Sequence, residues 1–396
     1  MIILVANLGS TSFKYKLYDM ASDERVLAVG AADRIGGDLS AWSIEAGGEK
    51  REGQATLADH AAAIELHLGE LAREGVIESI DAVDAVGFKA VHGGPISGAV
   101  IVDDHVLETM GQFADVAPAH NPMYIAAMKA FAQKLPKVPQ VAAFETAFHQ
   151  TIAPSRTTYA IPYKWTSELG IRRYGFHGAS HRYIATRMGQ LSPSVTTLIN
   201  CHLGGSSSLC AIRDGKSVAT SMGLTPQTGV PQSGRVGDFD IFALLKLRSA
   251  GIEADEALRE LGKQGGLLGI SGVSSDLRDI KQAAGEGNGR AQLAIEVFVE
   301  AIRDYIGAYM VLLGGADAIT FTGGIGQYNA DLRAMILSGL DFAGVEIDPR
   351  KNDGAQARAE TRIDADGSRT QVWVLPTNEE LIVARQTLAA LQANND

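Results

Sequence analysis

The sequence LVANLGSTSFKYKLYD, residues 4–19, predicts two β-strands joined by a turn of glycine and hydroxyl residues. The apolar run from Ile2 to Ala6 predicts the first strand, and the alternation that begins at Phe13 predicts the second. Glycine lets a backbone approach a phosphate closely, and serine hydroxyls and a lysine can donate hydrogen bonds to its oxygens. The stretch is therefore either an ordinary hairpin or a hairpin that clasps a phosphate group.

The same pattern returns in the second half of the chain. Placing residues 8–9 on residues 203–204 also places Ser12 on Ser207 without a gap. A single glycine–serine turn is a weak signal, whereas two such hairpins in one register indicate a duplicated domain. We therefore predict two similar halves, each with a phosphate loop, that face each other across a cleft.

Length and composition agree with two globular domains. A chain of 396 residues is too long for one ordinary core, and its hydrophobic content of 46% and charged content of 20% are typical of globular proteins. The net charge of -11 argues against a nucleic-acid or membrane partner, because such surfaces need clustered Lys and Arg. The sequence contains neither a signal-peptide pattern nor a run that could span a bilayer, so we expect a cytoplasmic protein.

Periodicity and turn residues predict the other main elements. Strands are expected near residues 83–88, 138–144, 318–321 and 372–375, and helices over 60–73, about 122–135 and about 291–313. Asp59 is the expected cap of the first helix, on which His67 is expected to face solvent. Thr377 and Glu380 fit a capping box at the start of the last helix, which leaves Glu379 available for chemistry.

Charged and glycine-rich segments follow several of these elements. One predicted strand ends in Lys89 and the next ends in Glu145, and the carboxyl ends of strands line the active edge of open α/β sheets. Two Arg and two His lie within residues 172–181, and the isolated Arg235 lies in a long loop. A third glycine turn, residues 322–326, precedes a helix and suits nucleotide phosphates. These segments together indicate phosphoryl transfer.

Seven motifs occur in one order along nearly the whole chain: Asn7–Lys14, Val91–Gly94, Tyr174–Gly178, Cys201–Gly204, Gly269–Ser274, Thr322–Gly326 and Pro376–Glu380. Together they resemble the acetate kinase family, which also includes propionate and butyrate kinases. Seven motifs in the family order make a chance resemblance negligible.

The resemblance implies the α/β fold of the sugar kinase, actin and chaperone ATPase superfamily, in which two duplicated domains of mixed sheets flanked by helices close on a nucleotide. The implied N-terminal domain is residues 1–149, with the last helix, about 380–396, returning to it, and residues 150–379 form the nucleotide-binding domain. The implied reaction is reversible transfer of the ATP γ-phosphoryl group, with Mg²⁺, to acetate, propionate or a similar short acid, which gives an acyl phosphate and ADP. A homodimer is also implied.

The resemblance further implies a metal site and phosphate contacts. Asn7 and Glu379 match the residues that hold Mg²⁺, directly or through water, which suits a hard cation that keeps part of its hydration. Ser10, Ser12 and Lys14 match phosphate contacts. The implied nucleotide contacts are His202, Leu203, Gly204, Gly205, Ser206, Asp276, Leu277, Arg278, Gly324, Ile325, Gly326, Gln327 and Tyr328.

Catalysis in the family needs no strong base, because the carboxylate nucleophile is already an anion. It should depend on positioning and on neutralising the phosphoryl oxygens. His177 and Arg235 match the pair that stabilises transition-state charge, and His120 matches a histidine that lines the site. Glu145 stands where the family usually has a catalytic Asp.

The substrate side departs from the family pattern. Lys89 stands where the family usually has an Arg that grips the carboxylate, so a point charge replaces a bidentate fork. We hypothesise that the changes at Lys89 and Glu145 are coupled, because a shorter cation can be met by a longer carboxylate. The acyl pocket has Ala119 in place of the usual Leu, whereas three apolar wall residues match, namely Val91, Phe176 and Pro226. The added room predicts a preference at or beyond propionate, since each buried methylene contributes about 0.8 kcal/mol.

The nucleotide side departs as well. Gly205-Ser206 replaces the usual Asn-Gly of the second hairpin, and Gln327-Tyr328 replaces the usual Glu-Asn after the third glycine turn. Family members that use pyrophosphate as donor also differ in this region. Two alternatives therefore stay open beside the acyl kinase: a kinase of the same fold with another acid or with pyrophosphate, and a nucleotide-binding sensor with reduced turnover.

Overall fold

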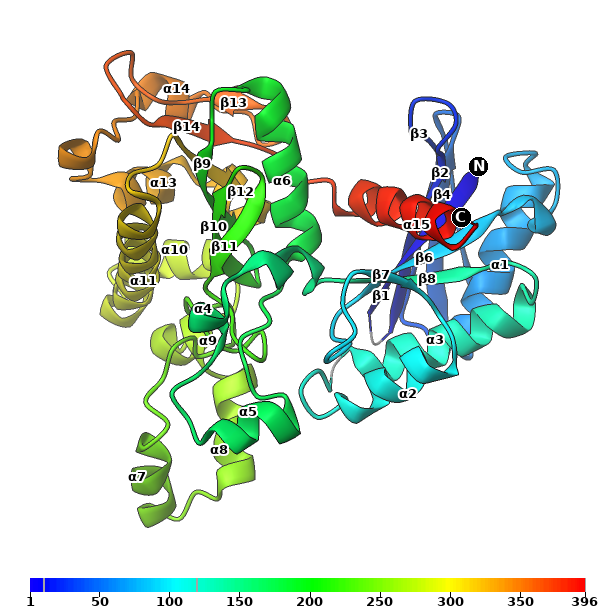
Figure 1. Ribbon diagram of the computed structural model, residues 1–396, viewed down its shortest axis with the longest axis horizontal. Helices are drawn as coiled ribbons and strands as arrows, with labels where there is room; N and C mark the ends of the chain where they lie inside the picture. The colour runs from blue at the N-terminus through cyan, green and yellow to red at the C-terminus, as the bar shows by residue number, and fades with distance from the viewer. Residues whose placement is uncertain (10, 119, 396) are drawn as a thin grey trace. The chain divides into compact units, whose positions relative to one another are not determined.

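The computed structural model describes residues 1–9, 11–118 and 120–395, so the predictions for Ser10 and Ala119 lie outside the described residues. The chain divides into two compact units. The first unit contains residues 1–147 together with the C-terminal segment that begins at Asn378, and the second unit contains residues 148–377. Each unit is built around one mixed sheet (Figure 1).

The sheet of the first unit has the strand order β5-β4-β3-β2-β1-β6-β8-β7. Strands β1 to β5 form an antiparallel meander. Strand β6 pairs with β1 in parallel, and β8 pairs with β6 in parallel. The strand bounds are β1 Ile2–Gly9, β2 Ser12–Asp19, β3 Arg25–Asp33, β4 Ser40–Ala46, β5 Glu49–Ala55, β6 Ala85–Ala90, β7 Ala99–Ile101 and β8 Gln140–Phe144. The helices are α1 His60–Arg73, α2 Asp104–Gln112, α3 Asn121–Lys134 and α15 Glu379–Asn395.

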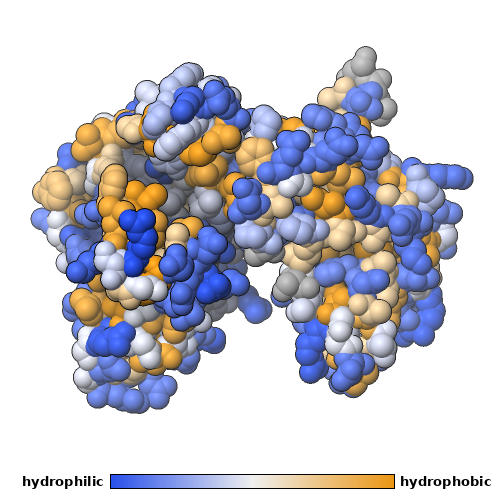
Figure 2. Space-filling view, turned by 90° about the horizontal axis from the view of Figure 1, so that it is seen from below, coloured by the Kyte–Doolittle hydropathy of each residue, from blue (hydrophilic) through white to orange (hydrophobic). Residues whose placement is uncertain are grey.

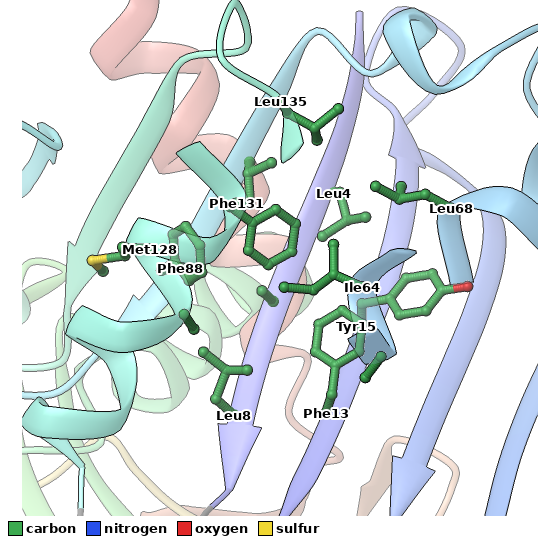
Figure 3. Packing of buried hydrophobic residues seen from close by; sticks show 14 of the residues in the cluster. Leu4, Leu8, Phe13, Tyr15, Ile64, Leu68, Phe88, Met128, Phe131 and Leu135 are labelled. Atoms are coloured by element: carbon green, nitrogen blue, oxygen red, sulfur yellow. The ribbon is translucent and has the colours of Figure 1, made fainter. Parts of the chain in front are cut away.

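Helices cover both faces of this sheet because strand side chains alternate between the faces. On one face Leu8 and Phe13, which pair across β1 and β2, pack with Ile64 of α1 and Phe131 of α3 (Figure 3). On the other face Ile3, Val5 and neighbouring apolar residues pack against α15. The last helix of the chain therefore belongs to the first unit and shields the second face of its sheet.

The sheet of the second unit has the strand order β11-β10-β9-β12-β14-β13. Its strands are β9 Thr197–Leu203, β10 Ser207–Arg213, β11 Lys216–Thr220, β12 Ala318–Thr322, β13 Thr361–Arg362 and β14 Gln371–Val374. Its helices are α4 Pro154–Thr157, α5 Tyr163–Leu169, α6 Gly178–Leu191, α7 Ala243–Ser249, α8 Ala254–Lys263, α9 Gly266–Ser271, α10 Leu277–Gly285, α11 Gly289–Leu313, α12 Gly323–Tyr328, α13 Ala330–Leu337 and α14 Pro349–Asp353. Helix α11 packs on one face of the sheet and α6 on the other.

The two sheets repeat one topology, which confirms the predicted α/β class with mixed sheets flanked by helices. The order β2-β1-β6-β8 in the first unit corresponds to β10-β9-β12-β14 in the second, with the same strand directions. The two hairpins differ by one residue in register. The last pair is Gly9 with Ser12 in the first hairpin and Leu203 with Ser207 in the second, so the second turn is one residue longer.

Two local predictions are wrong. His67 is 1% exposed instead of facing solvent, and its ring lies among Phe13, Tyr15 and Trp42. Burial lowers its pKa to about 4. By contrast, the predicted cap of α1 is confirmed, because the Asp59 carboxylate accepts a hydrogen bond from the Ala62 amide at 2.9 Å.

The predicted capping box at the start of α15 is also wrong. Asn378 caps the helix, since its Oδ1 accepts from the Leu381 amide at 3.3 Å. The Thr377 hydroxyl is buried and has no hydrogen-bond partner among the described residues. The Glu380 carboxylate pairs with the Lys16 ammonium at 3.2 Å.

The face shown in Figure 2 carries both hydrophilic and apolar side chains. Three exposed apolar side chains lie at the start of α7: Ile241 is 68% exposed, Phe242 73% and Leu245 56%. None of the helices in the part of the chain that the structure describes has both the length and the apolar character needed to cross a bilayer.

Candidate functional site

The predicted site residues divide between the two units, and each group is described within its own unit. In the first unit, strand alternation places Asn7 and Lys14 on the face that α15 covers, where they pair across β1 and β2. Lys89 lies near the end of β6 on the same face, and Glu145 directly follows β8. The parallel strands therefore bring their polar ends to one edge of the sheet.

Helix α15 adds an acidic group to this edge. Glu379 is the first residue of the helix, where the positive end of the helix dipole favours a carboxylate. The start of the helix is held by β2, because Lys16 and Tyr18 both donate to Asn378 Oδ1, at 3.5 and 3.3 Å. Glu379 is thus placed next to Lys89, although 290 positions separate them in the sequence.

The Lys89 ammonium lies between two carboxylates. It forms an ion pair and a hydrogen bond with Glu379 Oε2, and it lies 3.8 Å from Glu145 Oε1. The Glu145 side chain is 6% exposed and that of Glu379 13%, so the pairs are poorly screened. Burial disfavours the charge of Lys89, but the two carboxylates outweigh burial, and its pKa is raised.

This group of residues fits a hard divalent cation. A positive charge already stands between two carboxylates, and the Asn7 amide oxygen provides a further oxygen donor in the same unit. Among the described residues no group of three or more His, Cys, Asp and Glu side chains could hold a metal. Carboxylate and amide oxygens are the donor types that hard divalent cations accept, with water completing their coordination.

Tyr124 supports Asn7 and was missed by the sequence predictions. Its hydroxyl donates to Asn7 Oδ1 at 3.5 Å and accepts from the Leu8 amide at 3.3 Å. Burial raises the pKa of Tyr124 to about 12, so the hydroxyl keeps its proton. In the sequence Tyr124 is only one of several apolar residues along α3, and nothing marks it as a site residue.

His120 lies at the N-cap position of α3. The next residue, Asn121, is fully buried and donates from Nδ2 to the carbonyl oxygens of His92 and Met110, both at 2.8 Å. These bonds fix the start of the helix and therefore the backbone of His120. Val91 is half-buried and directly follows β6 in the same unit.

In the second unit His177 has an unusual backbone. It is the N-cap of α6 with φ 56° and ψ 29°, the left-handed region that residues other than glycine rarely adopt. Its side chain does not cap the helix, because Nδ1 lies 2.8 Å from Ser208 Oγ on β10. Backbone strain of this kind is concentrated at functional sites. Phe176, directly before it, is buried, and its carbonyl accepts from His149 Nε2 at 2.9 Å.

His202 lies beside His177, with their ring centroids 4.2 Å apart. It comes from β9, directly opposite Ser208 on β10, and its Nδ1 lies 2.8 Å from Ser180 Oγ of α6. The predicted residues His177 and His202 are thus brought together by the sheet and by α6. Leu203, the next residue of β9, is buried on the opposite face with the α11 core.

Arg235 lies in the long loop and contacts the turn of the second hairpin. Its Nη1 donates to Ser206 Oγ at 3.0 Å, to Gln232 Oε1 at 3.1 Å and to the Pro226 carbonyl at 3.5 Å. Burial lowers the pKa of its guanidinium, which nevertheless stays charged. In the described part of the chain no carboxylate lies within ion-pair distance of Arg235, so its charge is not neutralised by the protein there.

Gln232 holds this loop and was also missed by the sequence predictions. It is fully buried; its Oε1 accepts from Ser206 at 2.8 Å, and its Nε2 donates to the Pro226 carbonyl at 2.7 Å. The Ser233 amide also donates to the Gly205 carbonyl at 3.2 Å. Glutamine is normally exposed, so only a structure could identify this residue as the centre of the loop.

Of the remaining predicted nucleotide segments, one lies within α12 and the other lies at the start of α10. Helix α12 spans Gly323–Tyr328; Gly323 has φ +77°, and a Cβ there would lie 2.5 Å from the Leu203 carbonyl oxygen. Gln327 donates to the Leu375 carbonyl at 3.2 Å, whereas Tyr328 is 65% exposed.

Asp276 caps α10, and its carboxylate pairs with the exposed Arg278. The hydrogen bonds from Arg278 lower the pKa of Asp276 to about 2. Leu277 between them is buried.

The chain is similar to known proteins over nearly its whole length. The sequence matches the Acetokinase family over residues 2–385. The acetate kinase of Geobacillus sp. (strain WCH70) is 44% identical over 393 residues, which cover 98% of this chain and 98% of that protein. The crystal structure of Porphyromonas gingivalis acetate kinase has a TM-score of 0.89 at 36% identity, and the match covers 98% of this chain and 99% of that one.

A propionate kinase is similar to the same degree. The crystal structure of the enzyme from Francisella tularensis subsp. tularensis SCHU S4 has a TM-score of 0.90 at 34% identity, covering 98% of this chain and 99% of that one. These matches confirm the resemblance that the seven motifs predicted. The chain belongs to the acetokinase family.

Proposed function

We propose that this chain is a kinase of short carboxylates that reversibly transfers the γ-phosphoryl group of ATP to acetate, propionate or a similar acid. The observation that carries the proposal is its full-length membership of the acetokinase family, including 44% identity to an acetate kinase over 98% of both chains. The charged groups described above supply what such a transfer needs, which is anion positioning and charge neutralisation.

Asn7 and Glu379 would hold Mg²⁺, directly or through water. The position of the Lys89 ammonium beside Glu379 supports this assignment, because it marks a place that already attracts a cation. When bound, the ion would neutralise charge on the phosphate oxygens. Ser12 and Lys14, together with Ser10, which lies outside the described residues, would donate to the phosphoryl group.

His177 and Arg235 would stabilise the charge that develops on the transferring phosphoryl group. The strained backbone of His177 and the Arg235 guanidinium, which forms no ion pair among the described residues, support these roles. His120 would line the site. Glu145 would orient the reacting groups through Lys89, and it would not act as a strong base, because the nucleophile is already ionised.

Lys89 would bind the carboxylate of the acid, with Val91, Phe176 and Pro226 as apolar contacts. Ala119, which lies outside the described residues, would leave room where the family usually has Leu. We therefore expect a preference at or beyond propionate. The nucleotide would contact the segments 202–206, 276–278 and 324–328, in which Tyr328 is exposed enough to stack on a base.

We also propose a homodimer and a cytoplasmic location. The exposed apolar side chains Ile241, Phe242 and Leu245 of the second unit support self-association, since such clusters mark interaction surfaces. A location with access to ATP fits the proposed reaction. Light scattering on the purified protein and on Phe242→Asp tests the dimer, and a monomeric wild type would reject it.

The proposed reaction can be tested by trapping acyl phosphates with hydroxylamine. Acetate, propionate and butyrate are each supplied with ATP and Mg²⁺, or with pyrophosphate in place of ATP. We expect hydroxamate formation with ATP and the largest kcat/KM for propionate or butyrate. Product only with pyrophosphate would assign a different donor, and tight ATP binding without product from any acid would favour a sensor.

A further inference from the structure

A continuous row of hydrogen bonds leads from the sheet of the second unit to His177. It starts at Thr320 on β12 and runs through Asn200 on β9, His181 on α6 and Ser208 on β10. The distances are 2.8 Å from Thr320 Oγ1 to Asn200 Oδ1, 2.8 Å from Asn200 Nδ2 to His181 Nδ1, 2.9 Å from His181 Nε2 to Ser208 Oγ and 2.8 Å from Ser208 Oγ to His177 Nδ1.

The strand register explains why these residues meet. Thr320 pairs with Asn200 across β12 and β9, and alternation places Asn200 and Ser208 on the face that α6 covers. His181 is one helical turn after His177 on α6, so both histidines reach the same strand pair. The four residues behind His177 are 0% exposed.

The row has one consistent direction for its protons. The Thr320 hydroxyl donates to Asn200 Oδ1, which orients the amide so that Nδ2 donates to His181 Nδ1. His181 Nδ1 is therefore an acceptor, and its single proton is on Nε2, from which it donates to Ser208 Oγ. Ser208 then donates its own proton to His177 Nδ1. The proton of a neutral His177 must be on Nε2.

Burial keeps His181 neutral, and the direction of the hydrogen bonds disfavours a second proton on His177. Burial lowers the pKa of His181 well below its usual value, with the neighbouring His149 and His202 adding to the effect, so it carries only one proton. A second proton on His177 would have to donate to Ser208, whose hydroxyl is already turned toward His177.

We propose that Thr320, Asn200, His181 and Ser208 are positioning residues that hold His177 as the neutral Nε2–H tautomer. His177 would then act on the phosphoryl group as a fixed hydrogen-bond donor and not as an imidazolium or a base. The functional part of this inference rests on the role proposed for His177. The arrangement of the protons does not depend on it.

Long-range ¹⁵N–¹H NMR of ¹⁵N-histidine-labelled protein reads the tautomer directly at neutral pH. His177→Gln assigns the His177 signals. We expect a protonated Nε2 and an unprotonated Nδ1 for His177 in the wild type, and a loss of this single tautomer in Ser208→Ala. An Nδ1–H tautomer or an imidazolium in the wild type, or no change in Ser208→Ala, would contradict the proposed role of this row of hydrogen bonds.

Kinetics then separate positioning from mere stability. We expect Ser208→Ala to lower kcat roughly 10- to 100-fold, the range for groups that orient a functional side chain, with little change in KM. Thr320→Val, which keeps the shape of the side chain, should lower kcat by less in the same sense. Ser217→Ala is the matched control, because Ser217 Oγ lies 2.9 Å from His149 Nδ1, outside the row.

The outcomes distinguish the positioning role of the row from the catalytic role proposed for His177. A kcat that falls in Ser208→Ala and not in Ser217→Ala supports positioning, whereas equal losses in both variants would reduce the row to packing. If His177→Gln retains full turnover while NMR still finds the Nε2–H tautomer, the proposed role of His177 fails and the proton arrangement stands.

Discussion

The Lys89 ammonium lies 3.8 Å from Glu145 Oε1, at the ends of neighbouring parallel strands, and it also pairs with Glu379. Lys89 and Glu145 are the two substrate-side positions at which the resemblance to the family leads us to expect Arg and Asp. A direct ion pair between them gives a physical reason for the two departures to occur together. The length of each side chain determines how long the other must be to keep the charges in contact.

The coupling predicts non-additive mutant kinetics. Lys89→Arg and Glu145→Asp should each lower kcat/KM, because either change alone alters the distance between the charges. The double variant should recover activity, with an interaction free energy of at least about 0.5 kcal/mol. Hydroxamate assays on the four proteins measure it, and additive losses would show that the two positions act independently.

Lys89 should compete with a divalent cation in the protein without nucleotide. Lys89→Met removes the ammonium from between two carboxylates, so Mn²⁺ should bind several-fold more tightly, as followed by electron paramagnetic resonance. Lys16→Met is a matched control, since Lys16 pairs with the neighbouring Glu380 at 3.2 Å. Unchanged or weaker Mn²⁺ binding in Lys89→Met would mean that Lys89 and the cation do not share the carboxylates.

Arg235 should contribute mainly to the transition state. Arg235→Ala should lower kcat by about 10²- to 10³-fold, the usual effect of removing one group that stabilises developing charge. Arg235→Lys should recover only part of the loss, because a lysine lacks the planar fork. Arg213→Ala, which removes an arginine that donates to the carbonyls of α11, is the control. A change in KM alone would indicate ground-state binding.

His67 should make the protein sensitive to acid. Its pKa is about 4 in the folded protein, because of burial, and about 6.5 when the chain is unfolded. The unfolded state therefore binds more protons between these values, and stability falls as pH drops from about 6.5 to 4, by up to about 3 kcal/mol. His67→Leu should flatten the decline in Tm over this window. His105→Gln, which changes an exposed histidine, should leave the decline in Tm unchanged. If Tm declines equally in both variants, groups other than His67 cause the acid sensitivity.

The cap of α15 gives a stability prediction at neighbouring residues. Asn378→Ala removes the acceptor for the Leu381 amide and for two side chains of β2, and it should cost about 1 kcal/mol or more. Thr377→Ala should cost less, because the Thr377 hydroxyl has no partner among the described residues. Urea unfolding curves compare the two variants, and the reverse order would restore Thr377 as the cap.

Local signals predicted much of the fold. Asp59 and the apolar spacing after it predicted α1 with its cap and both ends, because a cap and a helical stripe depend only on neighbouring residues. The two hairpins were predicted from their turns. The burial of His67 was not, since its ring is enclosed by strands β2 and β4 and by its own helix, which no local pattern reports.

The sequence predicted those residues of the candidate site that lie in recognisable motifs. Lys89 and Glu145 were expected at the active edge of the sheet because each follows a predicted strand, and their coupling was a hypothesis. The pairing of Lys89 with Glu379 depends on the packing of α15 against the first sheet. Gln232 and Tyr124 were not predicted, because their residue types alone do not indicate the hydrogen bonds that they form. The row behind His177 depends on strand register, which the gapless repeat of the two hairpins misrepresents.

That register difference places equivalent residues of the two hairpins in different surroundings. By sequence Ser208 is the counterpart of Phe13, which pairs with Leu8 and faces the core beneath α1 and α3. The longer second turn flips β10 relative to β9, so Ser208 pairs with His202 and meets α6 instead. The two hairpins align without an inserted residue, so the one-residue change of pairing alone moves this position from the core to the side of His177.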